Sequence, residues 1–114
     1  MTQEDIDLLF RDLCARLPYG VKVTFAGYSR REDCILNSQH LNSTYAIEYL
    51  GLKPYLRTIS SMTEEEEIEF QEINLFELLY TVEGLDWLNA HHFDYRGLIP
   101  LGLAVEASEG MYNN

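Results

Sequence analysis

A chain of 114 residues, 46% of them hydrophobic and with a formal net charge of −11, has the composition of one compact domain rather than of a disordered segment. Residues 1–60 hold seven basic and seven acidic side chains, whereas residues 61–114 hold one arginine against twelve acids. The second half therefore carries the whole net charge, and its negative field excludes direct binding of nucleic acid and disfavours an anionic membrane.

The two ends and the two cysteines indicate a compartment. The N-terminus begins with acids instead of a basic stretch, and no window approaches the ~20 apolar residues of a membrane span. We therefore expect a cytoplasmic protein without membrane association. In that compartment Cys14 and Cys34 are expected to be reduced, buried thiols.

The first predicted element is a helix over residues 3–17. Thr2 can cap it with Asp5 three residues on, and apolar residues then recur at helical spacing on one face. Asp12 and Arg16 are expected on the opposite, solvent side. The helix should end at Pro18 and Gly20, which break the repeat.

A small sheet is predicted next. Residues 21–26 alternate apolar and polar side chains, which is typical of a half-buried strand, and residues 34–39 form a returning strand. Tyr45, Ile47 and Tyr49 alternate again. The simplest result is a three-stranded antiparallel sheet over residues 21 to about 50.

An acidic helix is predicted after the sheet. Thr63 is its expected N-cap and Glu66 completes a capping box, while the acids of the first turn suit the helix dipole. Apolar residues from Ile68 to Tyr80 follow the helical period. Gly84 is expected to divide this helix from a shorter one that ends near the histidines.

The segment "WLNAHHFDYRGLIPLGLA" contains the candidate metal ligands His91, His92 and Asp94. Adjacent histidines lie about 100° apart on a helix and cannot bind one ion from a regular helix. We expect them at a helix C-terminus, with a metal site left as the alternative. Asp94 should cap a following turn, and Arg96 should form an ion pair. The leucine-rich remainder should reach the core through Leu98, Ile99, Leu101 and Leu103.

No catalytic or cofactor motif is present, which favours a non-enzymatic protein with no catalytic residues, no cofactor and no metal. The acidic run can instead present carboxylates to a basic partner protein. The candidate partner-binding residues are Glu64, Glu65, Glu66, Glu67 and Glu69. The alternative is a small-ligand site, such as one that sequesters a nucleotide, using cations of residues 22–57. Its candidate residues are Arg30, Arg31, Lys53, Tyr55 and Arg57.

Three segments carry a family resemblance. The strings "DLCARLPYGV", "KPYLRTISSMTEEE" and "WLNAHHFDYRGLIPLGLAVEASEGMY" cover nearly half of the chain. With them, the chain resembles a family of small proteins of uncharacterised function that gut anaerobe genomes and their phages or mobile elements encode. The resemblance implies a host-associated accessory gene and transfers no functional residues.

Together these patterns predict a single α+β domain over residues 1–114. We expect an N-terminal helix, a small antiparallel sheet of about three strands and C-terminal helices packed on it. The functional hypothesis is an acidic interaction protein of mobile-element or phage origin. Its expected partner is a host protein, in particular a basic, nucleic-acid-binding or defence protein that it inhibits.

Overall fold

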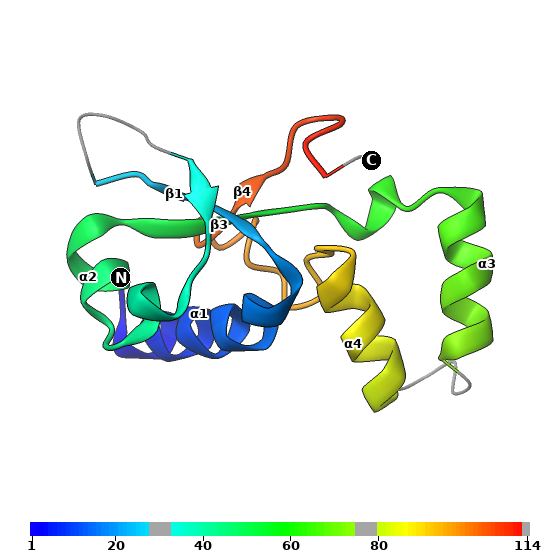
Figure 1. Cartoon of the computed structure of the whole chain (residues 1–114), viewed down its shortest axis with the longest axis horizontal. Coiled ribbons are helices and arrows are strands. Elements are labelled where there is room, and N and C mark those ends of the chain that lie inside the picture. The colour runs from blue at the N-terminus through cyan, green and yellow to red at the C-terminus, as the bar shows by residue number, and fades with distance from the viewer. Residues whose placement is uncertain (28–32, 75–79, 113–114) are drawn as a thin grey trace.

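The structure, a computed structural model, describes residues 1–27, 33–74 and 80–112. Within these residues the chain forms four α-helices and a four-stranded mixed sheet, so the predicted α+β class is confirmed (Figure 1). The elements in chain order are α1 (Gln3–Arg16), β1 (Lys22–Phe25), β2 (Cys34–Ile35), α2 (Tyr45–Leu50), β3 (Leu52–Leu56), α3 (Glu64–Ile73), α4 (Val82–Ala90) and β4 (Val105–Glu106). Three short 3₁₀ helices are η1 (Leu17–Tyr19), η2 (Ser38–Leu41) and η3 (Ile59–Ser61).

Helix α1 begins as its sequence predicts. The Thr2 side chain accepts a hydrogen bond from the Asp5 backbone N–H at 3.1 Å, and the Asp5 carboxylate accepts one from the Thr2 N–H at 3.2 Å. Ile6, Leu9 and Leu13, spaced three and four residues apart, are buried on one face. The helix therefore forms from a local cap and an apolar stripe that the sheet covers.

The charged residues of α1 correct two expectations. Asp12 and Arg16 are expected in solvent because they are charged, yet both are fully buried, because the chain after α4 covers them and supplies their partners. Cys14, expected inside, is exposed, and Cys34 is half-buried. At 100° per residue, Asp12 and Arg16 lie beside Leu9, so α1 buries one broad face that includes two charged residues. Neither cysteine is in a disulfide bond, as expected.

The sheet has the order β2-β1-β3-β4. Strand β1 pairs antiparallel with β2 and with β3, with Val23 opposite both Cys34 and Pro54. The predicted antiparallel pairing of residues 21–26 with the chain near Cys34 is therefore confirmed. The returning strand, however, ends at Ile35 instead of residue 39, because η2 begins at Ser38. Strand β4 adds in parallel to β3 through Tyr55 opposite Val105, so the sheet is mixed rather than purely antiparallel.

The third strand of the sheet lies elsewhere than the alternation of tyrosines predicts. Residues 45–49 belong to α2, where Tyr45 and Tyr49 lie one turn apart on the exposed side with ring centroids 5.0 Å apart. Over six residues, alternation and helical spacing give similar patterns. Gly51, with φ of 65°, ends α2, and β3 starts immediately after it.

The boundary between α3 and α4 also differs from the prediction. Helix α3 ends at Ile73, and Thr81 caps α4 by accepting a hydrogen bond from the Gly84 N–H at 2.9 Å. Gly84 thus lies inside α4 instead of dividing two helices. A Cβ on Gly84 would stand 2.5 Å from the Asn74 side chain, so this glycine permits close packing. The apolar residues expected between positions 75 and 79 lie outside the described residues.

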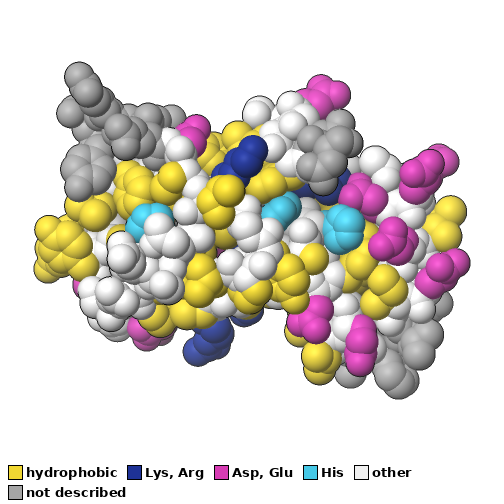
Figure 2. All heavy atoms as spheres, viewed as in Figure 1, with side chains coloured by type: hydrophobic (Ala, Val, Ile, Leu, Met, Phe, Trp, Pro, Cys, Tyr) yellow, Lys and Arg dark blue, Asp and Glu magenta, His cyan; other side chains and the backbone are white. Residues whose placement is uncertain are grey.

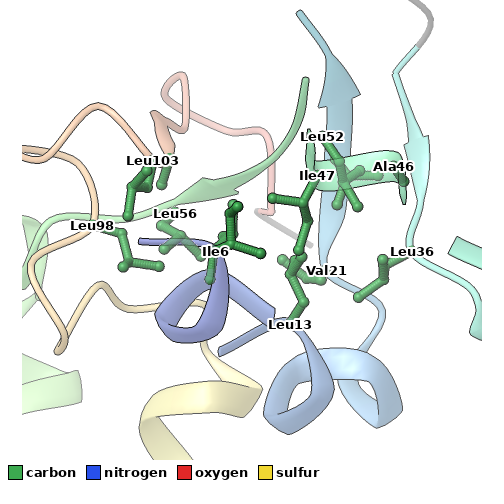
Figure 3. Close-up of a cluster of buried hydrophobic side chains, with 13 residues drawn as sticks. Ile6, Leu13, Val21, Leu36, Ala46, Ile47, Leu52, Leu56, Leu98 and Leu103 are labelled. Carbon is green, nitrogen blue, oxygen red and sulfur yellow. The ribbon is translucent and has the colours of Figure 1, made fainter. Parts of the chain in front are cut away.

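The main core lies between α1, α2 and the sheet (Figure 3). It draws on α1, β1, α2, β3 and neighbouring segments but on neither α3 nor α4, and the segment after α4 contributes Leu98 and Leu103 as expected. Leu101, predicted to join them, is exposed because Gly102, with φ of 75°, turns the chain there. The buried members are Ile6, Leu9, Leu13, Val21, Val23, Leu36, Ala46, Ile47, Leu52, Leu56, Leu98, Leu103 and Ala104.

Helices α3 and α4 stand beyond the end of the sheet (Figure 1). Helix α4 packs against α1, and α3 packs against α4. A second cluster of three buried residues, Trp87, Leu88 and Phe93, lies here, with Phe70 and Ile73 of α3 against it. None of the ten residues of α3 is itself buried, so this helix leaves most of its surface to solvent.

Candidate interaction surface

The first turn of α3 holds the predicted capping box, and Glu66 does more than cap. Its carboxylate accepts the Thr63 N–H at 3.0 Å and binds the Arg57 guanidinium through two hydrogen bonds of 2.8 and 2.7 Å. Arg57 also lies over the Phe93 ring, 4.2 Å from its centroid. The hydrogen bonds from Arg57 lower the pKa of Glu66 to about 2. Glu66 therefore attaches α3 to the end of β3.

Glu69 forms the second polar attachment of α3. Its carboxylate accepts a hydrogen bond from the Trp87 indole N–H at 2.8 Å, one turn after Glu66. Trp87 also contacts the Phe70 ring, with centroids 5.4 Å apart. Two of the five candidate partner-binding residues, Glu66 and Glu69, thus bind the chain itself.

The other three candidates, Glu64, Glu65 and Glu67, are exposed, as is Glu72. We call these four residues the acidic face of α3. At 100° per residue, Glu64 lies opposite the side of the helix that holds Glu66 and Glu69, and Glu65, Glu67 and Glu72 flank it on either side. Figure 2 shows the carboxylates gathered over α3 at the right of the view. Ile68, 58% exposed, lies among them.

The charge of the acidic face is not neutralised nearby. Among the described residues after position 60, Arg96 is the one lysine or arginine, and it pairs with Asp12 of α1 at 3.1 Å. Arg57, which reaches α3 from the first half, is held by Glu66. The expected ion pair of Arg96 is confirmed, and its partner lies 84 residues away in sequence.

Two hollows border α3. One, with a volume of about 570 Å³, lies between α3, α4 and η3 and is lined by Ile59, Met62, Glu67, Phe70, Gln71, Asn74, Tyr80 and Leu88. We call it the α3–α4 groove. The other, of about 760 Å³, lies between the first turn of α3 and the C-terminal segment, and its charged lining residues are Arg57, Glu66, Glu106 and Glu109. Carboxylates outnumber the single cation there, which disfavours an anionic ligand.

The alternative small-ligand residues do not converge. Lys53, Tyr55 and Arg57 alternate along one side of the chain at β3, so Lys53 and Arg57 stand about 13 Å apart along it. Tyr55 is buried and its hydroxyl donates to Asp33 at 2.9 Å. Arg57 is committed to Glu66. Arg30 and Arg31 lie outside the described residues.

The two histidines have separate neighbours. His91 is the C-cap of α4, as expected, with its ring centroid 4.1 Å from Trp87 and its Nδ1 3.7 Å from the Glu66 carboxylate. His92 adopts a left-handed conformation with φ of 65° and stacks on Tyr112 with centroids 3.8 Å apart. Among the residues that the structure describes, no group of three histidine, cysteine or acidic side chains could hold a metal ion.

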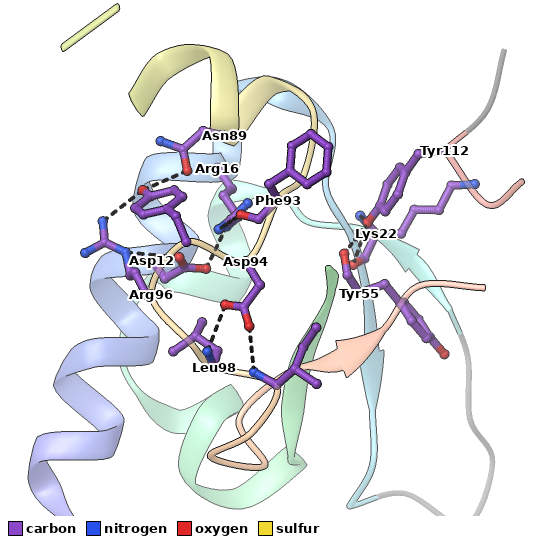
Figure 4. A network of polar contacts seen from close by, with 12 residues as sticks. Asp12, Arg16, Lys22, Tyr55, Asn89, Phe93, Asp94, Arg96, Leu98 and Tyr112 are labelled. Atoms are coloured by element: carbon purple, nitrogen blue, oxygen red, sulfur yellow. Dashed lines mark hydrogen bonds and ion pairs between the residues drawn. The ribbon is translucent and has the colours of Figure 1, made fainter. Parts of the chain in front are cut away.

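Asp94 performs the predicted cap. Its two carboxylate oxygens accept hydrogen bonds from the Leu98 N–H at 2.8 Å and from the Ile99 N–H at 2.9 Å (Figure 4). This turn carries Leu98 into the main core. The candidate metal ligand Asp94 is therefore occupied by backbone donors of its own loop.

A buried polar network positions α4 on α1, and sequence reasoning missed it. Arg16 donates to Asp12 at 2.8 Å and to the Phe93 carbonyl at 2.7 Å, and Arg96 binds the other oxygen of Asp12 (Figure 4). Arg96 also reaches Tyr95 at 3.2 Å. The i, i+4 spacing of Asp12 and Arg16 was the available signal, but it also describes an ordinary surface ion pair.

Tyr112 fastens the C-terminal segment across the sheet. Its hydroxyl donates to the Tyr55 carbonyl at 2.7 Å and accepts the Lys22 N–H at 2.8 Å (Figure 4). Burial raises the pKa of Tyr112 to about 12. Burial, with the positive charges of Arg16, Arg57 and Lys22, lowers the pKa of His92 to about 4. The stacked His92 is therefore neutral at neutral pH.

Comparison with protein-family models, curated proteins and solved structures finds no match for this chain. No helix of the described residues is long and apolar enough to cross a membrane.

Proposed function

We propose that this protein is a non-enzymatic interaction protein that binds a basic host protein through the acidic face of α3. The observation that carries the proposal is the position of α3. Its ten residues include none that is buried, while Glu64, Glu65, Glu67 and Glu72 are exposed with no cation beside them among the described residues of the second half. Helix α3 contributes no fully buried residue to the protein and carries negative charge that no nearby cation among the described residues neutralises. Such a helix is available to bind an oppositely charged surface of another protein.

The proposal extends to origin and role. The resemblance of three segments to proteins of gut anaerobes and their mobile elements supports a phage or mobile-element source. A small acidic protein from such a source can inhibit a host nucleic-acid-binding or defence protein, because its carboxylates can occupy the host protein's binding groove in place of nucleic-acid phosphates. The partner is accordingly a protein, and direct nucleic-acid binding is not expected.

The first experiment compares two variants with the same net charge. Glu64→Gln/Glu65→Gln/Glu67→Gln removes three charges from α3 and leaves the attachments of Glu66 and Glu69 intact. The control, Glu4→Gln/Asp7→Asn/Glu48→Gln, removes three exposed charges from α1 and α2. Each tagged protein is used to capture proteins from host lysate at low and at high salt, and mass spectrometry identifies what is retained.

We expect the wild type and the control to retain the same basic protein at low salt and to release it at high salt, because salt screens exposed charges. The α3 variant should lose it. Equal capture by both variants, or no protein captured by the wild type, would contradict the proposal. A nucleotide that copurifies in place of a protein would favour the small-ligand alternative.

A further inference from the structure

The α3–α4 groove offers an apolar floor beside the acidic face. Five of its eight lining residues are apolar or aromatic, and they come from η3, its following residue, α3, the chain before α4, and α4: Ile59, Met62, Phe70, Tyr80 and Leu88. Ile59 is 40% exposed and Tyr80 50% exposed. The groove has a volume of about 570 Å³, which lies within the range of about 300–1,000 Å³ typical of ligand pockets.

The groove remains open because α3 uses a different side to attach to the chain. Glu66 and Glu69 bind Arg57 and Trp87 on one side of the helix. Glu67, Gln71 and Asn74, about 100° further round, line the groove. Phe70 lies between the two sides, with its ring 5.4 Å from Trp87 and 6.0 Å from Tyr80. The apolar floor is thus continuous with the second core cluster.

The charge around the groove restricts its occupant. No lysine or arginine lines it among the described residues, and Glu67, a member of the acidic face, also lines the groove. A nucleic acid is repelled by these carboxylates. A purely polar cation leaves the apolar floor unused, whereas a segment with both apolar and basic side chains satisfies both parts of the surface.

We propose that the α3–α4 groove receives the apolar side chains of a basic amphipathic helix of the partner protein, whose lysines and arginines contact the acidic face. Apolar residues at i, i+3, i+4 and i+7 enter the groove beside Ile59, Phe70 and Tyr80. The groove supplies affinity by burying apolar surface, and the carboxylates supply orientation and a fast encounter. This inference rests on the proposed function and names the class of partner.

The probes are two peptides of about 18 residues made of leucine and lysine in the same proportion. One places its leucines on a single helical face, and the other has a scrambled order with the same charge. Isothermal titration calorimetry gives their Kd values for the wild type. We expect the amphipathic peptide to bind about tenfold or more tightly than the scrambled one, because only its leucines can enter the groove together.

Two variants form a matched pair. Ile59→Gln makes the groove polar, and Ile68→Gln makes the same change at an exposed isoleucine of the outer side of α3. Neither changes the charge. Ile59→Gln should raise the Kd of the amphipathic peptide about tenfold, whereas Ile68→Gln should change it less than about twofold. Gln71→Trp, at an exposed helix position that lines the groove, should block the groove and replaces Ile59→Gln as the test variant if the latter does not fold.

Equal Kd values for the two isoleucine variants, or for the two peptides, would overturn the inference. Glu64→Gln/Glu65→Gln separates it from the proposed function, because this variant leaves the groove lining unchanged. If that variant lost binding while Ile59→Gln had no effect, the result would support binding through the acidic face. It would also show that the α3–α4 groove does not receive the partner's apolar side chains. A dimer in analytical ultracentrifugation that Ile59→Gln dissolves would assign the groove to a second copy of the chain and also reject it.

Discussion

Two regions of the protein are stabilised by different interactions. One is the body, formed by α1, α2, the sheet and the segment after residue 96. The other is the α3–α4 unit, which we define as residues 59–74 and 80–95. The body buries thirteen apolar residues in one cluster, whereas the α3–α4 unit buries three. Helix α3 is attached by the half-buried side chains of Phe70 and Ile73, which pack against the second cluster. It is also attached by the carboxylates of Glu66 and Glu69, which bind Arg57 and Trp87. Apolar burial dominates folding free energy, so the body determines the stability of the chain.

This difference suits a division of roles. A surface that binds a partner must leave charged and apolar groups exposed, and groups left exposed contribute little to folding. The α3–α4 unit exposes Ile59, Ile68 and Tyr80 together with its carboxylates, whereas α1 buries apolar and charged residues alike. The three predictions below test how separate the two regions are.

The largest expected effect lies where α1 meets the end of α4. Asp12→Ala leaves Arg16 buried without its carboxylate and removes the partner of Arg96, which should cost about 3–5 kcal/mol of unfolding free energy. Urea denaturation followed by circular dichroism measures it. Asp7→Ala, on the exposed side of the same helix, should cost no more than about 0.5 kcal/mol. Similar costs for the two variants would show that the network does not join the regions.

The second effect concerns the junction fastened by Tyr112. The pKa of His92 is about 4 in the folded chain against 6.5 for the free side chain, so between these values the unfolded chain binds more protons. Stability from the neutral imidazole is complete above pH 6.5 and is lost as the pH falls towards 4, by about 2–3 kcal/mol. His92→Asn, which tolerates the positive φ, should remove most of this pH dependence between about pH 5 and 6.5 in urea titrations. Below about pH 5 the lowered pKa of Glu66 still makes stability fall with pH in both proteins.

His91→Gln is the control for that experiment. His91 is the C-cap of α4, and its replacement leaves the buried imidazole of His92 in place. This variant should therefore show the same change of stability with pH as the wild type. A slope that disappears with His91→Gln and persists with His92→Asn would reverse the assignment.

The smallest effect gives the sharpest comparison, because α1 and α3 begin with the same capping box. Thr2→Ala and Thr63→Ala should each cost their helix about 1 kcal/mol. In α1 this loss should appear in the global unfolding midpoint. In α3 it should appear as faster hydrogen exchange of α3 amides, with the midpoint almost unchanged. Equal shifts of the midpoint would show that α3 unfolds together with the body.

Local signals along the chain were sufficient for several elements. The caps at Thr2, Thr63 and Asp94 and the antiparallel pairing near Val23 depend on residues close in sequence, and all were predicted. The same local signals failed at Tyr45–Leu50, where a short alternation turned out to be α2, because six residues do not distinguish the two periods.

The candidate site divides in the same way. The run of glutamates predicted an acidic helix, but nothing in the run indicated that Glu66 and Glu69 bind other parts of the chain. Glu64, Glu65 and Glu67 are exposed and have no such contact among those described. The partners of Glu66 and Glu69 are nine and eighteen residues away. Tertiary folding therefore decides which glutamates bind other residues of the chain and which can bind a partner.

By itself, the sequence determined the fold class, the starts of α1 and α3 and the concentration of negative charge in the second half, because these depend on composition and on neighbours within a few residues. The tertiary structure alone decided that Asp12 and Arg16 are buried, that β4 joins β3 in parallel and that α3 stands clear of the core. These features depend on contacts between residues far apart in the chain, and such contacts become favourable only when the intervening segments have folded.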